Sequence, residues 1–308
     1  MSSPKHIIVM TGATSGIGAE AVKQLAAEPA TLVLIGARGQ GRSAPGAEVF
    51  PLDLASLSSV RAFADAIQQR LGEANIEMLV LNAGGQFPGG KLSGDGFEMT
   101  FATNHLAHYL LARLLLPNMA VGGRLVLTTS DTHDPAVFPF APRTLDPEEL
   151  AHPSKAGSGG ARAYAASKLC NLLTARSFAA LDTVKANTIQ VIAYNPGLTL
   201  GTGLGRTDAQ RQSSPQRPNP LAHAIFGLLG RFNNAWSPGT PERAGEVLAQ
   251  LTLGIITPPP GRVYASLVKG EITFPDPSEL ARSDEARDRL WRESASMVGL
   301  PVEATSVR

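Results

Sequence analysis

The segment TGATSGIG at residues 11–18 constrains the fold of this chain most, because it places Gly12, Gly16 and Gly18 directly after the apolar run HIIVM. A glycine inside a helix or strand costs about 0.5–1 kcal/mol relative to alanine, so this cluster indicates a turn that needs bare backbone. The residues that follow have the pattern of a helix. The segment therefore predicts a strand, a tight glycine turn and a helix, in that order.

Apolar, β-rich runs alternate along the whole chain with helical patterns. We predict strands at residues 6–10, 31–37, 47–52, 76–83, 123–130, 188–195 and 261–265. We predict helices at about residues 16–28, 56–71, 96–117, 162–182 and 241–253, and a capped amphipathic helix within residues 277–300. Several strands are apolar on both faces, which is typical of strands buried in a parallel sheet. The alternation predicts an α/β fold with a doubly wound parallel sheet covered by helices.

Two segments interrupt this alternation. Residues 131–161 are rich in proline and glycine and contain no convincing strand, and residues 199–240 contain one apolar helical piece. Loops of this length in a compact domain are usually functional lids or disordered. We interpret residues 1–308 as a single domain, in which residues 131–161 form an insert and residues 199–240 a substrate-binding segment.

Composition excludes several classes of protein. The chain has 27 Lys and Arg against 26 Asp and Glu, which argues against a nucleic-acid partner, because such a partner requires a basic stripe. Its single cysteine, Cys170, excludes an internal disulfide, and the spacing of its six histidines predicts no metal site. We see neither a signal peptide nor an apolar run long enough for a membrane span, so we expect a cytoplasmic protein.

The glycine turn predicts an anion site. The N–H groups and the dipole at the start of a helix attract a phosphate, and glycines let the backbone approach a pyrophosphate closely. The spacing T-G-x-x-x-G-x-G differs from the G-x-G-x-x-G fingerprint, and a tight turn without a ligand is the alternative interpretation. We favour a dinucleotide site.

Arg38 bears on the choice of dinucleotide. In the usual pattern an acidic residue at the end of the second strand binds the ribose 2′-hydroxyl. This chain has Arg38 at that point, and an arginine suits a 2′-phosphate because it can form charge-assisted hydrogen bonds with it. We therefore expect NADP(H) rather than NAD(H). A solvated surface arginine is the alternative.

Tyr164 and Lys168 lie four residues apart in a predicted helix, so they share one face. A neighbouring ammonium stabilises a phenolate, so we expect Lys168 to lower the pKa of Tyr164 and make it a usable general acid. Ser130 ends a predicted strand, at the edge of the sheet where ligands bind in such folds. A surface pair and a serine that caps a turn are the alternatives.

These motifs together resemble the short-chain dehydrogenase/reductase family. The matching segments are TGATSGIG (11–18), DL (53–54), LNAG (81–84), TNHLAHYLL (103–111), GRLVLTTS (123–130), YAASK (164–168) and NPG (195–197). They span about residues 5–200 in the order of the family. The resemblance implies a Rossmann fold that binds NAD(P)(H), and hydride transfer between the nicotinamide and a small-molecule carbonyl or alcohol.

The resemblance also implies individual roles. Tyr164 would be the general acid/base, Lys168 would bind the nicotinamide ribose and tune Tyr164, Ser130 would orient the substrate, and Asn104 would hold a water in a proton relay. The implied cofactor contacts are Gly12, Thr14, Ser15, Gly16, Ile17, Gly18, Arg38, Asp53, Leu54, Asn82, Ala83, Gly84, Pro196, Gly197 and Thr199. Members of the family pair through the helices that carry Asn104 and Tyr164, so the resemblance suggests a homodimer.

Within the family, residues 104–111, 159–180 and 290–294 resemble the branch of retinol dehydrogenases and light-dependent protochlorophyllide reductases. The insert at residues 131–161 resembles the extended segment that precedes the catalytic tyrosine in that branch. The reductases of the branch resemble monomers, so a monomer is the alternative to the homodimer. The chain departs from the branch between Arg38 and Asp53, where we expect a helix of the branch to be missing.

The leading prediction is an NADP(H)-dependent carbonyl reductase or alcohol dehydrogenase with Tyr164 as its acid/base. Two alternatives remain open: reduction of an activated C=C bond, as in the protochlorophyllide branch, and a non-catalytic NADP-binding sensor. We interpret Cys170 as a buried structural thiol. His133 follows Ser130 closely enough to contact a substrate if it does not pack in the core.

Overall fold

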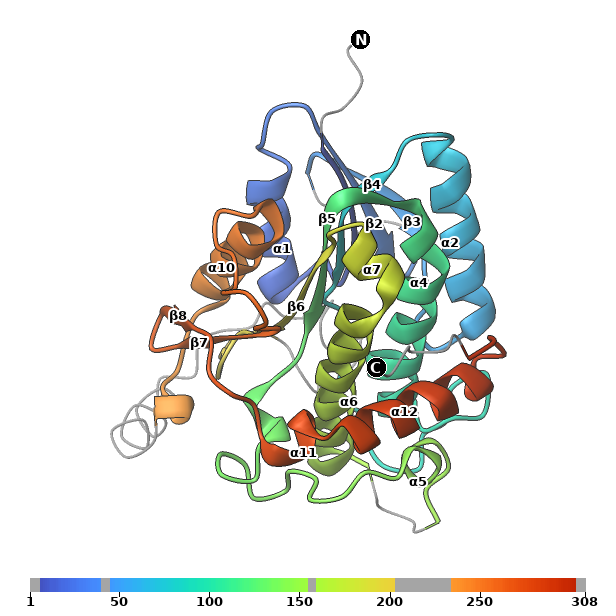
Figure 1. Cartoon of the computed structure of the whole chain (residues 1–308), viewed down its shortest axis with the longest axis vertical. Helices are drawn as coiled ribbons and strands as arrows, with labels where there is room; N and C mark the ends of the chain where they lie inside the picture. The colour runs from blue at the N-terminus through green and yellow to red at the C-terminus, as the bar shows by residue number, and fades with distance from the viewer. Residues whose placement is uncertain (1–5, 40–44, 155–158, 203–233, 303–308) are drawn as a thin grey trace.

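The computed structural model describes residues 6–39, 45–154, 159–202 and 234–302 (Figure 1). These residues form an eight-stranded sheet with the order β3-β2-β1-β4-β5-β6-β7-β8. Neighbouring strands are parallel except β7 and β8, which pair antiparallel. The strands are β1 (His6–Thr11), β2 (Thr31–Ala37), β3 (Ala47–Pro51), β4 (Ile76–Leu81), β5 (Met119–Thr128), β6 (Gln190–Asn195), β7 (Tyr264–Val268) and β8 (Glu271–Thr273).

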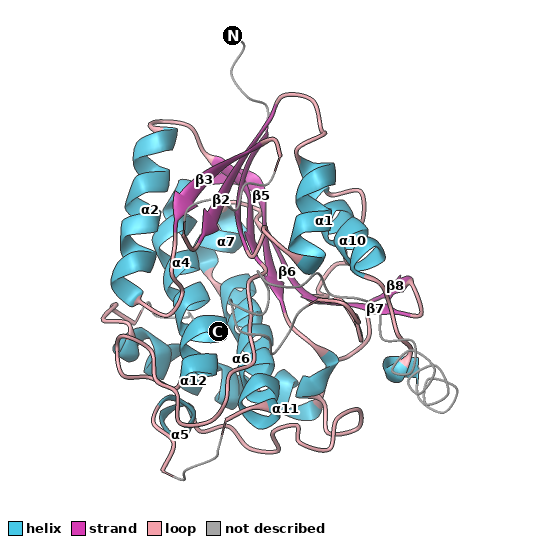
Figure 2. Cartoon of the chain, turned by 180° about the vertical axis from the view of Figure 1, so that it is seen from behind, coloured by secondary structure: helices cyan, strands magenta, loops and turns pink. Residues whose placement is uncertain are grey.

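Helices cover both faces of the sheet (Figure 2). Helices α1 and α10 pack against each other on one face, and α2, α4 and α6 lie on the other. The α-helices among the described residues are α1 (Gly16–Leu25), α2 (Leu57–Leu71), α3 (Met99–Phe101), α4 (Ala107–Leu115), α5 (Pro147–Ala151), α6 (Ala161–Ala180), α7 (Asp182–Ala186), α10 (Pro241–Leu253), α11 (Glu279–Arg282) and α12 (Asp284–Met297). The predicted doubly wound α/β fold is confirmed.

The sheet order creates a crevice beside β1. The chain runs outward from β1 to β2 and β3, and then returns to the other side of β1 to form β4. The loops that leave the carboxyl ends of β1 and β4 therefore diverge, and ligands bind in open α/β sheets at such a reversal. The glycine turn at residues 12–16 leaves β1 at this point.

The region predicted as one helix at residues 96–117 is interrupted. After α3 the backbone forms a π-helical turn, η1 (Ala102–Leu106), before α4 begins, and a 3-10 turn, η2 (Leu116–Asn118), follows α4. Single π-helical turns within helices are frequent at functional sites. Here the π-helical turn carries Asn104. The apolar pattern of the sequence does not reveal this turn, because the side chains of the π-helical turn and of α4 are buried alike.

The C-terminal part of the sheet also differs from the prediction. The last parallel strand is displaced from the predicted residues 261–265 to β7, and the antiparallel edge strand β8 was not predicted. Between Arg38 and Asp53 the described residues contain β3 and no helix. Much of the segment at residues 199–240, with its apolar helical piece, lies outside the described residues.

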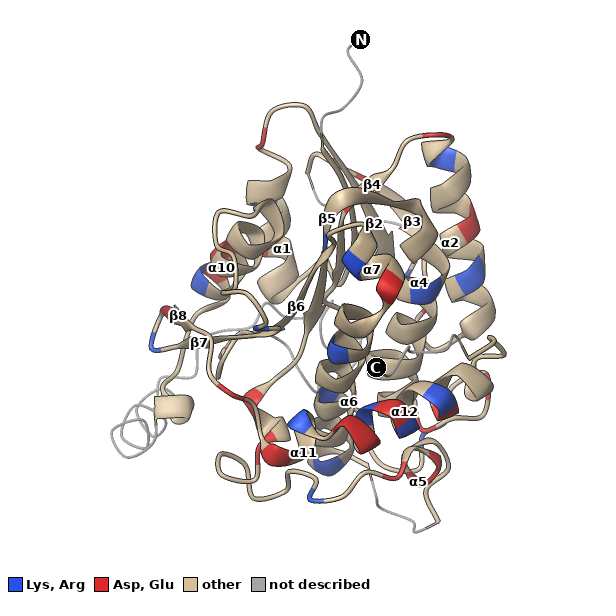
Figure 3. Ribbon diagram, viewed as in Figure 1, with Lys and Arg blue, Asp and Glu red and all other residues tan. Residues whose placement is uncertain are grey.

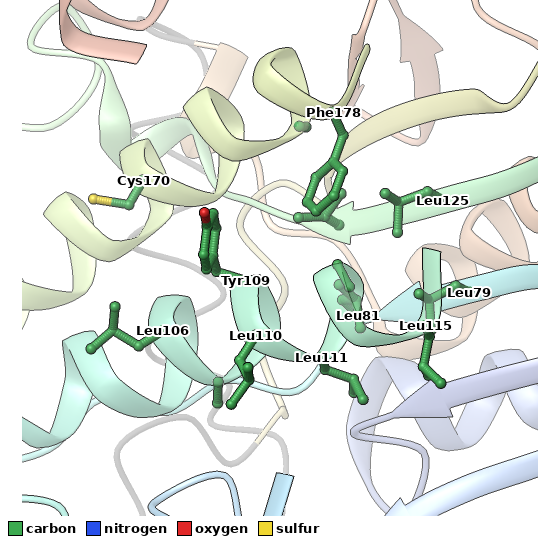
Figure 4. Close-up of a cluster of buried hydrophobic side chains, with 14 of the residues drawn as sticks. Leu79, Leu81, Leu106, Tyr109, Leu110, Leu111, Leu115, Leu125, Cys170 and Phe178 are labelled. Atoms are coloured by element: carbon green, nitrogen blue, oxygen red, sulfur yellow. The ribbon is translucent and has the colours of Figure 1, made fainter. Parts of the chain in front are cut away.

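The C-terminal helix covers α4 and α6. Trp291 on α12 is almost fully buried, with its ring edge-on to Tyr109 of α4 at 4.9 Å and to Phe178 of α6 at 5.2 Å between centroids. Figure 4 shows Tyr109 and Phe178 among the buried side chains of the core. The outer face of α12 has charges of both signs side by side, as in the pairs of Arg287 with Asp284 and Arg289 with Glu293 (Figure 3). The helix therefore has one apolar face, which packs on the α4–α6 layer.

No helix among the described residues is long and apolar enough to cross a membrane.

Candidate functional site

A cavity of about 840 Å³ lies at the carboxyl ends of the strands. Every residue predicted to contact a cofactor lines it: Gly12, Thr14, Ser15, Gly16, Ile17, Gly18, Arg38, Asp53, Leu54, Asn82, Ala83, Gly84, Pro196, Gly197 and Thr199. Ser130, Tyr164 and Lys168 line the same cavity. Asn104 lies behind the wall, bonded to Gly85, which does line it. The fold thus brings together residues that are far apart in the sequence.

The glycine turn fits a phosphate group. Gly12 and Gly16 have φ values of +68° and +55°, which favour glycine, and a Cβ on Gly18 would lie 1.9 Å from the carbonyl oxygen of Gly12. Ser15 precedes α1 without capping it through its side chain, whereas Ser56 accepts a hydrogen bond at the start of α2. The first turn of α1 therefore presents backbone N–H groups to the cavity, as anion binding requires.

One end of the cavity is bounded by the ends of β2 and β3. Arg38 directly follows β2 and is exposed, and Asp53 follows β3. The Asp53 carboxylate accepts a hydrogen bond from the Ala55 N–H at 3.0 Å, and this contact helps to fix the turn before α2. A guanidinium and a carboxylate thus stand at the same end of the cavity.

Asn82 and Thr11 connect the glycine turn to the centre of the sheet. The Asn82 amide donates to the Gly12 carbonyl at 3.1 Å and accepts from the Thr128 hydroxyl at 3.0 Å. The Thr11 hydroxyl accepts from the Asn82 and Ala83 N–H groups, each at 3.1 Å. These bonds join β1, β4 and β5 beside the cavity and hold the wall in one geometry.

His108 links this network to the turn that carries Asn104. Its Nδ1 lies 3.1 Å from the Asn104 carbonyl, and its Nε2 lies 3.0 Å from the Thr11 hydroxyl. The carbonyl can only accept, so Nδ1 carries the proton and Nε2 accepts from Thr11. Burial lowers the pKa of His108 to about 3, with the Lys168 charge adding to the shift. His108 is therefore a neutral structural residue at ordinary pH.

Asn104 holds the loop after β4. Its Oδ1 accepts from the Gly85 N–H at 2.8 Å, and its Nδ2 donates to the Gly85 carbonyl at 2.8 Å and to the Ser167 hydroxyl at 3.0 Å. A Cβ on Gly84 would come within 3.2 Å of the Lys168 Nζ and 3.5 Å of the Asn104 Oδ1. The absence of a side chain at Gly84 thus leaves space between the Lys168 ammonium and the Asn104 amide. The relay role of Asn104 stays a prediction.

Lys168 is anchored in the cavity wall by the end of β5. Its Nζ donates to the Thr128 carbonyl at 3.1 Å and lies 5.5 Å from the centre of the Tyr164 ring. Burial lowers the pKa of Lys168 to about 8, so the ammonium form still predominates at neutral pH. The lysine is therefore placed beside Tyr164 with its charge retained.

Tyr164 does not behave as its sequence context predicts. Burial raises the pKa of its hydroxyl above the ordinary value, the nearby Asp131 carboxylate raises it further, and hydrogen bonding by Ser130 lowers it. The shift of the Tyr164 pKa is thus upward, opposite to the predicted lowering, because burial and an acidic neighbour disfavour the phenolate. Tyr164 is a phenol, and so a proton donor, at neutral pH.

Ser130 and Asp131 follow β5 in sequence and enter the cavity together. Ser130 stands before a 3-10 turn, η3 (Asp131–His133), where its hydroxyl accepts from the Thr132 N–H at 3.3 Å and donates to the Asp131 carboxylate at 3.4 Å. Sequence analysis did not identify Asp131, because its effect on the pKa of Tyr164 acts between the turn after β5 and helix α6, which are separate in the sequence.

Two residues considered for a substrate role lie away from the cavity. His133 is buried, with Nδ1 2.6 Å from the Ser130 carbonyl and its ring against Tyr264. Cys170 is buried among apolar side chains of the α4–α6 layer, and burial raises the pKa of its thiol (Figure 4). Both His133 and Cys170 are thus buried in the core and do not line the cavity. Among the described residues no group of three or more His, Cys, Asp and Glu side chains could hold a metal.

An apolar part of the cavity wall was not predicted residue by residue from the sequence. Its wall includes Phe87 after β4, Val137 and Phe138 after η3, and Leu198 and Trp236 further along the chain. Lys91 also lines the cavity, with its Nζ 5.7 Å from the centre of the Phe87 ring. These residues lie on irregular loops, where no periodic pattern could have identified them.

Comparisons with known proteins agree with this architecture. Residues 6–140 match the family described as short chain dehydrogenase. The chain is 35% identical over 216 residues to a candidate daunorubicin C-13 ketoreductase of Streptomyces sp., an alignment that covers 66% of this chain and 69% of the relative. It is 30% identical over 327 residues to protochlorophyllide reductase A of Hordeum vulgare, covering 96% of this chain and 80% of the relative.

A solved structure of an uncharacterised protein from Mycobacterium paratuberculosis matches almost the whole chain. Its TM-score is 0.68 at 25% sequence identity, and the match covers 97% of this chain and 96% of the other. The likeness therefore extends beyond residues 6–140 to the C-terminal elements.

Proposed function

Because the chain belongs to the short-chain dehydrogenase/reductase family, we propose that it is an NADP(H)-dependent reductase that converts a carbonyl to an alcohol, with Tyr164 as the proton donor. The observation that carries the proposal is the placement of Ser130, Tyr164 and Lys168 in one cavity with the glycine turn. The same residues support the reverse oxidation when the alcohol is in excess.

Each residue has a distinct part in this proposal. When bound, the nicotinamide supplies the hydride that reduces the carbonyl carbon. The Ser130 hydroxyl holds the carbonyl oxygen, and Tyr164 gives its proton to that oxygen as negative charge develops. Lys168, fixed by the Thr128 carbonyl, places a positive charge beside the phenolate that Tyr164 becomes. Asn104 holds the Gly85 backbone and keeps the turn that borders Lys168 in place.

The wall formed by Phe87, Val137, Phe138, Leu198 and Trp236 supports a substrate with a bulky apolar body. Aromatic side chains bury large apolar surfaces, and about 25 cal/mol of stabilisation accompanies each Å² removed from water. A small hydrophilic ketone would leave much of this wall in contact with water. We therefore propose apolar or aromatic ketones and aldehydes as substrates.

The test is NADPH oxidation, followed by its absorbance, with a panel of carbonyl compounds graded in apolar surface. We expect turnover to increase from small aliphatic ketones to bulky aromatic ones. Tight NADPH binding without turnover of any member would contradict the proposal and favour the sensor alternative.

Arg38 is expected to set the preference for NADPH. Its replacement by alanine should raise the KM for NADPH about 10- to 100-fold and leave the KM for NADH nearly unchanged, because charge-assisted hydrogen bonds contribute about 1.5–3 kcal/mol. Arg162→Ala is the matched control, since Arg162 stacks on Phe140 and both lie outside the cavity lining. Equal effects on both cofactors would show that Arg38 does not read the 2′-phosphate.

Reduction of a C=C bond is the second candidate. It is favoured by the likeness to protochlorophyllide reductase A, which covers 96% of this chain. The products separate the two reactions, since carbonyl reduction gives an alcohol and C=C reduction leaves the carbonyl intact. An α,β-unsaturated ketone offered as substrate presents both groups to the enzyme at once.

A further inference from the structure

Lys91 places a positive charge in the aromatic part of the cavity wall. The residue is exposed and also lines the cavity, so its ammonium lies where the cavity opens to solvent. Its Nζ lies 5.7 Å from the centre of the Phe87 ring. Within the described ranges the Lys91 side chain forms neither an ion pair nor a hydrogen bond. A contact with an aromatic face leaves the N–H donors of the ammonium for another partner.

The loop that carries Lys91 is fixed at both ends. The Lys91 carbonyl accepts a hydrogen bond from the Met99 N–H at 2.9 Å, next to α3. The Phe87 carbonyl accepts from the Gly160 N–H at 3.1 Å, at the start of α6. The Phe87 ring lies against Gly85, where a Cβ would come within 2.8 Å of it. Lys91 is therefore presented to the cavity from a defined position beside this ring.

The acidic residues that follow Lys91 in the chain do not neutralise its charge. The Asp95 carboxylate accepts a hydrogen bond from the Leu57 N–H at 2.8 Å. The Glu98 side chain is buried and accepts from the Phe101 N–H at 2.7 Å. Both carboxylates are thus directed to backbone groups, and the Lys91 charge is left uncompensated by the described part of the loop.

Two other cationic side chains of the cavity lining have a different placement. Lys168 donates to the Thr128 carbonyl at 3.1 Å. Arg38 follows β2, which lies on the other side of β1 from β4 and the loop of Lys91. We expect Arg38 to bind the 2′-phosphate of the cofactor. Lys91 is therefore the cation that stands beside the aromatic wall, where we place the substrate.

We propose that the substrate carries a carboxylate on its apolar or aromatic body and that Lys91 binds this carboxylate. The inference rests on the proposed function and names its substrate class as keto acids with a bulky apolar body. The body packs on the wall that includes Phe87 and Phe138, and the carboxylate lies at the solvent-facing edge of that wall. A single ammonium is a compact point charge that suits one carboxylate, whereas phosphate recognition favours the fork of an arginine.

The test compares ketones that differ in charge but hardly in shape. The probes are the ortho, meta and para isomers of benzoylbenzoate, each paired with its primary amide. NADPH oxidation gives kcat/KM for each probe. In the wild-type chain the best isomer should be preferred over its amide about tenfold, because a charge-assisted hydrogen bond is stronger than a neutral one and the open site screens part of the gain. Lys91→Gln should remove this preference, and Lys91→Arg should retain it.

Arg162→Ala is the matched control for Lys91→Gln. The Arg162 guanidinium carbon lies 4.9 Å from the centre of the Phe140 ring, so this residue too is a cation on an aromatic ring, but neither residue lines the cavity. Arg162→Ala should therefore keep the wild-type preference for the acid. High ionic strength should weaken that preference in the wild-type chain, because salt screens exposed charges.

Binding of the same probes to the complex with the oxidised cofactor, measured by calorimetry, separates this inference from the proposed function. Tighter binding of an acid than of its amide, lost in Lys91→Gln, would support the role of Lys91 even without turnover, and the missing turnover would then contradict carbonyl reduction alone. Equal binding of acids and amides by the wild-type chain would overturn the inference. So would an undiminished preference in Lys91→Gln, or an equal loss in Arg162→Ala, which would indicate a general field of positive charge.

Discussion

Replacing Tyr164 with phenylalanine is expected to lower kcat for carbonyl reduction by about 10²–10⁴-fold, because the ring remains in place and only the proton donor is removed. The KM for NADPH should change little. The rate is measured as NADPH oxidation with the best carbonyl substrate. Tyr264→Phe is the matched control, since Tyr264 is also a buried phenol near Asp131 but does not line the cavity.

Retention of most of the turnover by Tyr164→Phe would contradict the assignment of the proton donor. Loss of activity in Tyr264→Phe as well would mean that the region is sensitive to any change. The pair therefore separates a chemical role from a structural one.

Replacing Trp291 with alanine is expected to reduce the free energy of unfolding by about 3–5 kcal/mol, which is the usual cost of deleting a large buried aromatic side chain. Trp291 contacts Tyr109 and Phe178, and the Arg113 guanidinium lies 4.9 Å from the centre of its ring. The loss would remove the aromatic contacts of α12 with both helices beneath it. Chemical denaturation followed by circular dichroism measures the change.

The second tryptophan gives the control for this measurement. Trp236 is only partly buried and lines the cavity, so Trp236→Ala should destabilise the fold much less and affect substrate binding instead. A loss below about 1 kcal/mol for Trp291→Ala would show that α12 is not an integral part of the core.

The position of α12 also bears on assembly. The resemblance to the family suggests pairing through the helices that carry Asn104 and Tyr164. In this chain the Tyr109 hydroxyl on α4 donates to the Trp291 carbonyl, and the Arg176 guanidinium on α6 bonds Asp284 at 2.7 Å. We therefore expect α12 to occupy part of the face that a second copy would use, so that a homodimer would need another surface.

The local parts of the fold could be predicted from the sequence. The glycine turn is encoded in eight consecutive residues, and the strands β1, β2, β4 and β6 are largely apolar runs that are buried in the sheet. Tyr164 and Lys168 belong to one helix, and Ser130 ends a strand. These signals lie close together along the chain, so they can be recognised without tertiary contacts.

The remaining features depend on contacts between distant segments. The protonation of Tyr164 depends on burial and on Asp131, which is 33 positions earlier in the chain (164 − 131). The edge strand β8 is three residues long and exists by pairing with β7. The π-helical turn carries Asn104, whose amide bonds the distant residues Gly85 and Ser167. None of these has a periodic or local signature.

The most direct measurement is the fate of the hydride. The enzyme is supplied with NADPH that carries deuterium at C4 of the nicotinamide, together with an α,β-unsaturated aromatic ketone, and the product is analysed by NMR. The proposed function predicts deuterium on the carbinol carbon of an allylic alcohol. Deuterium on a carbon of the former C=C bond, with the ketone retained, would contradict carbonyl reduction and establish the C=C reaction instead.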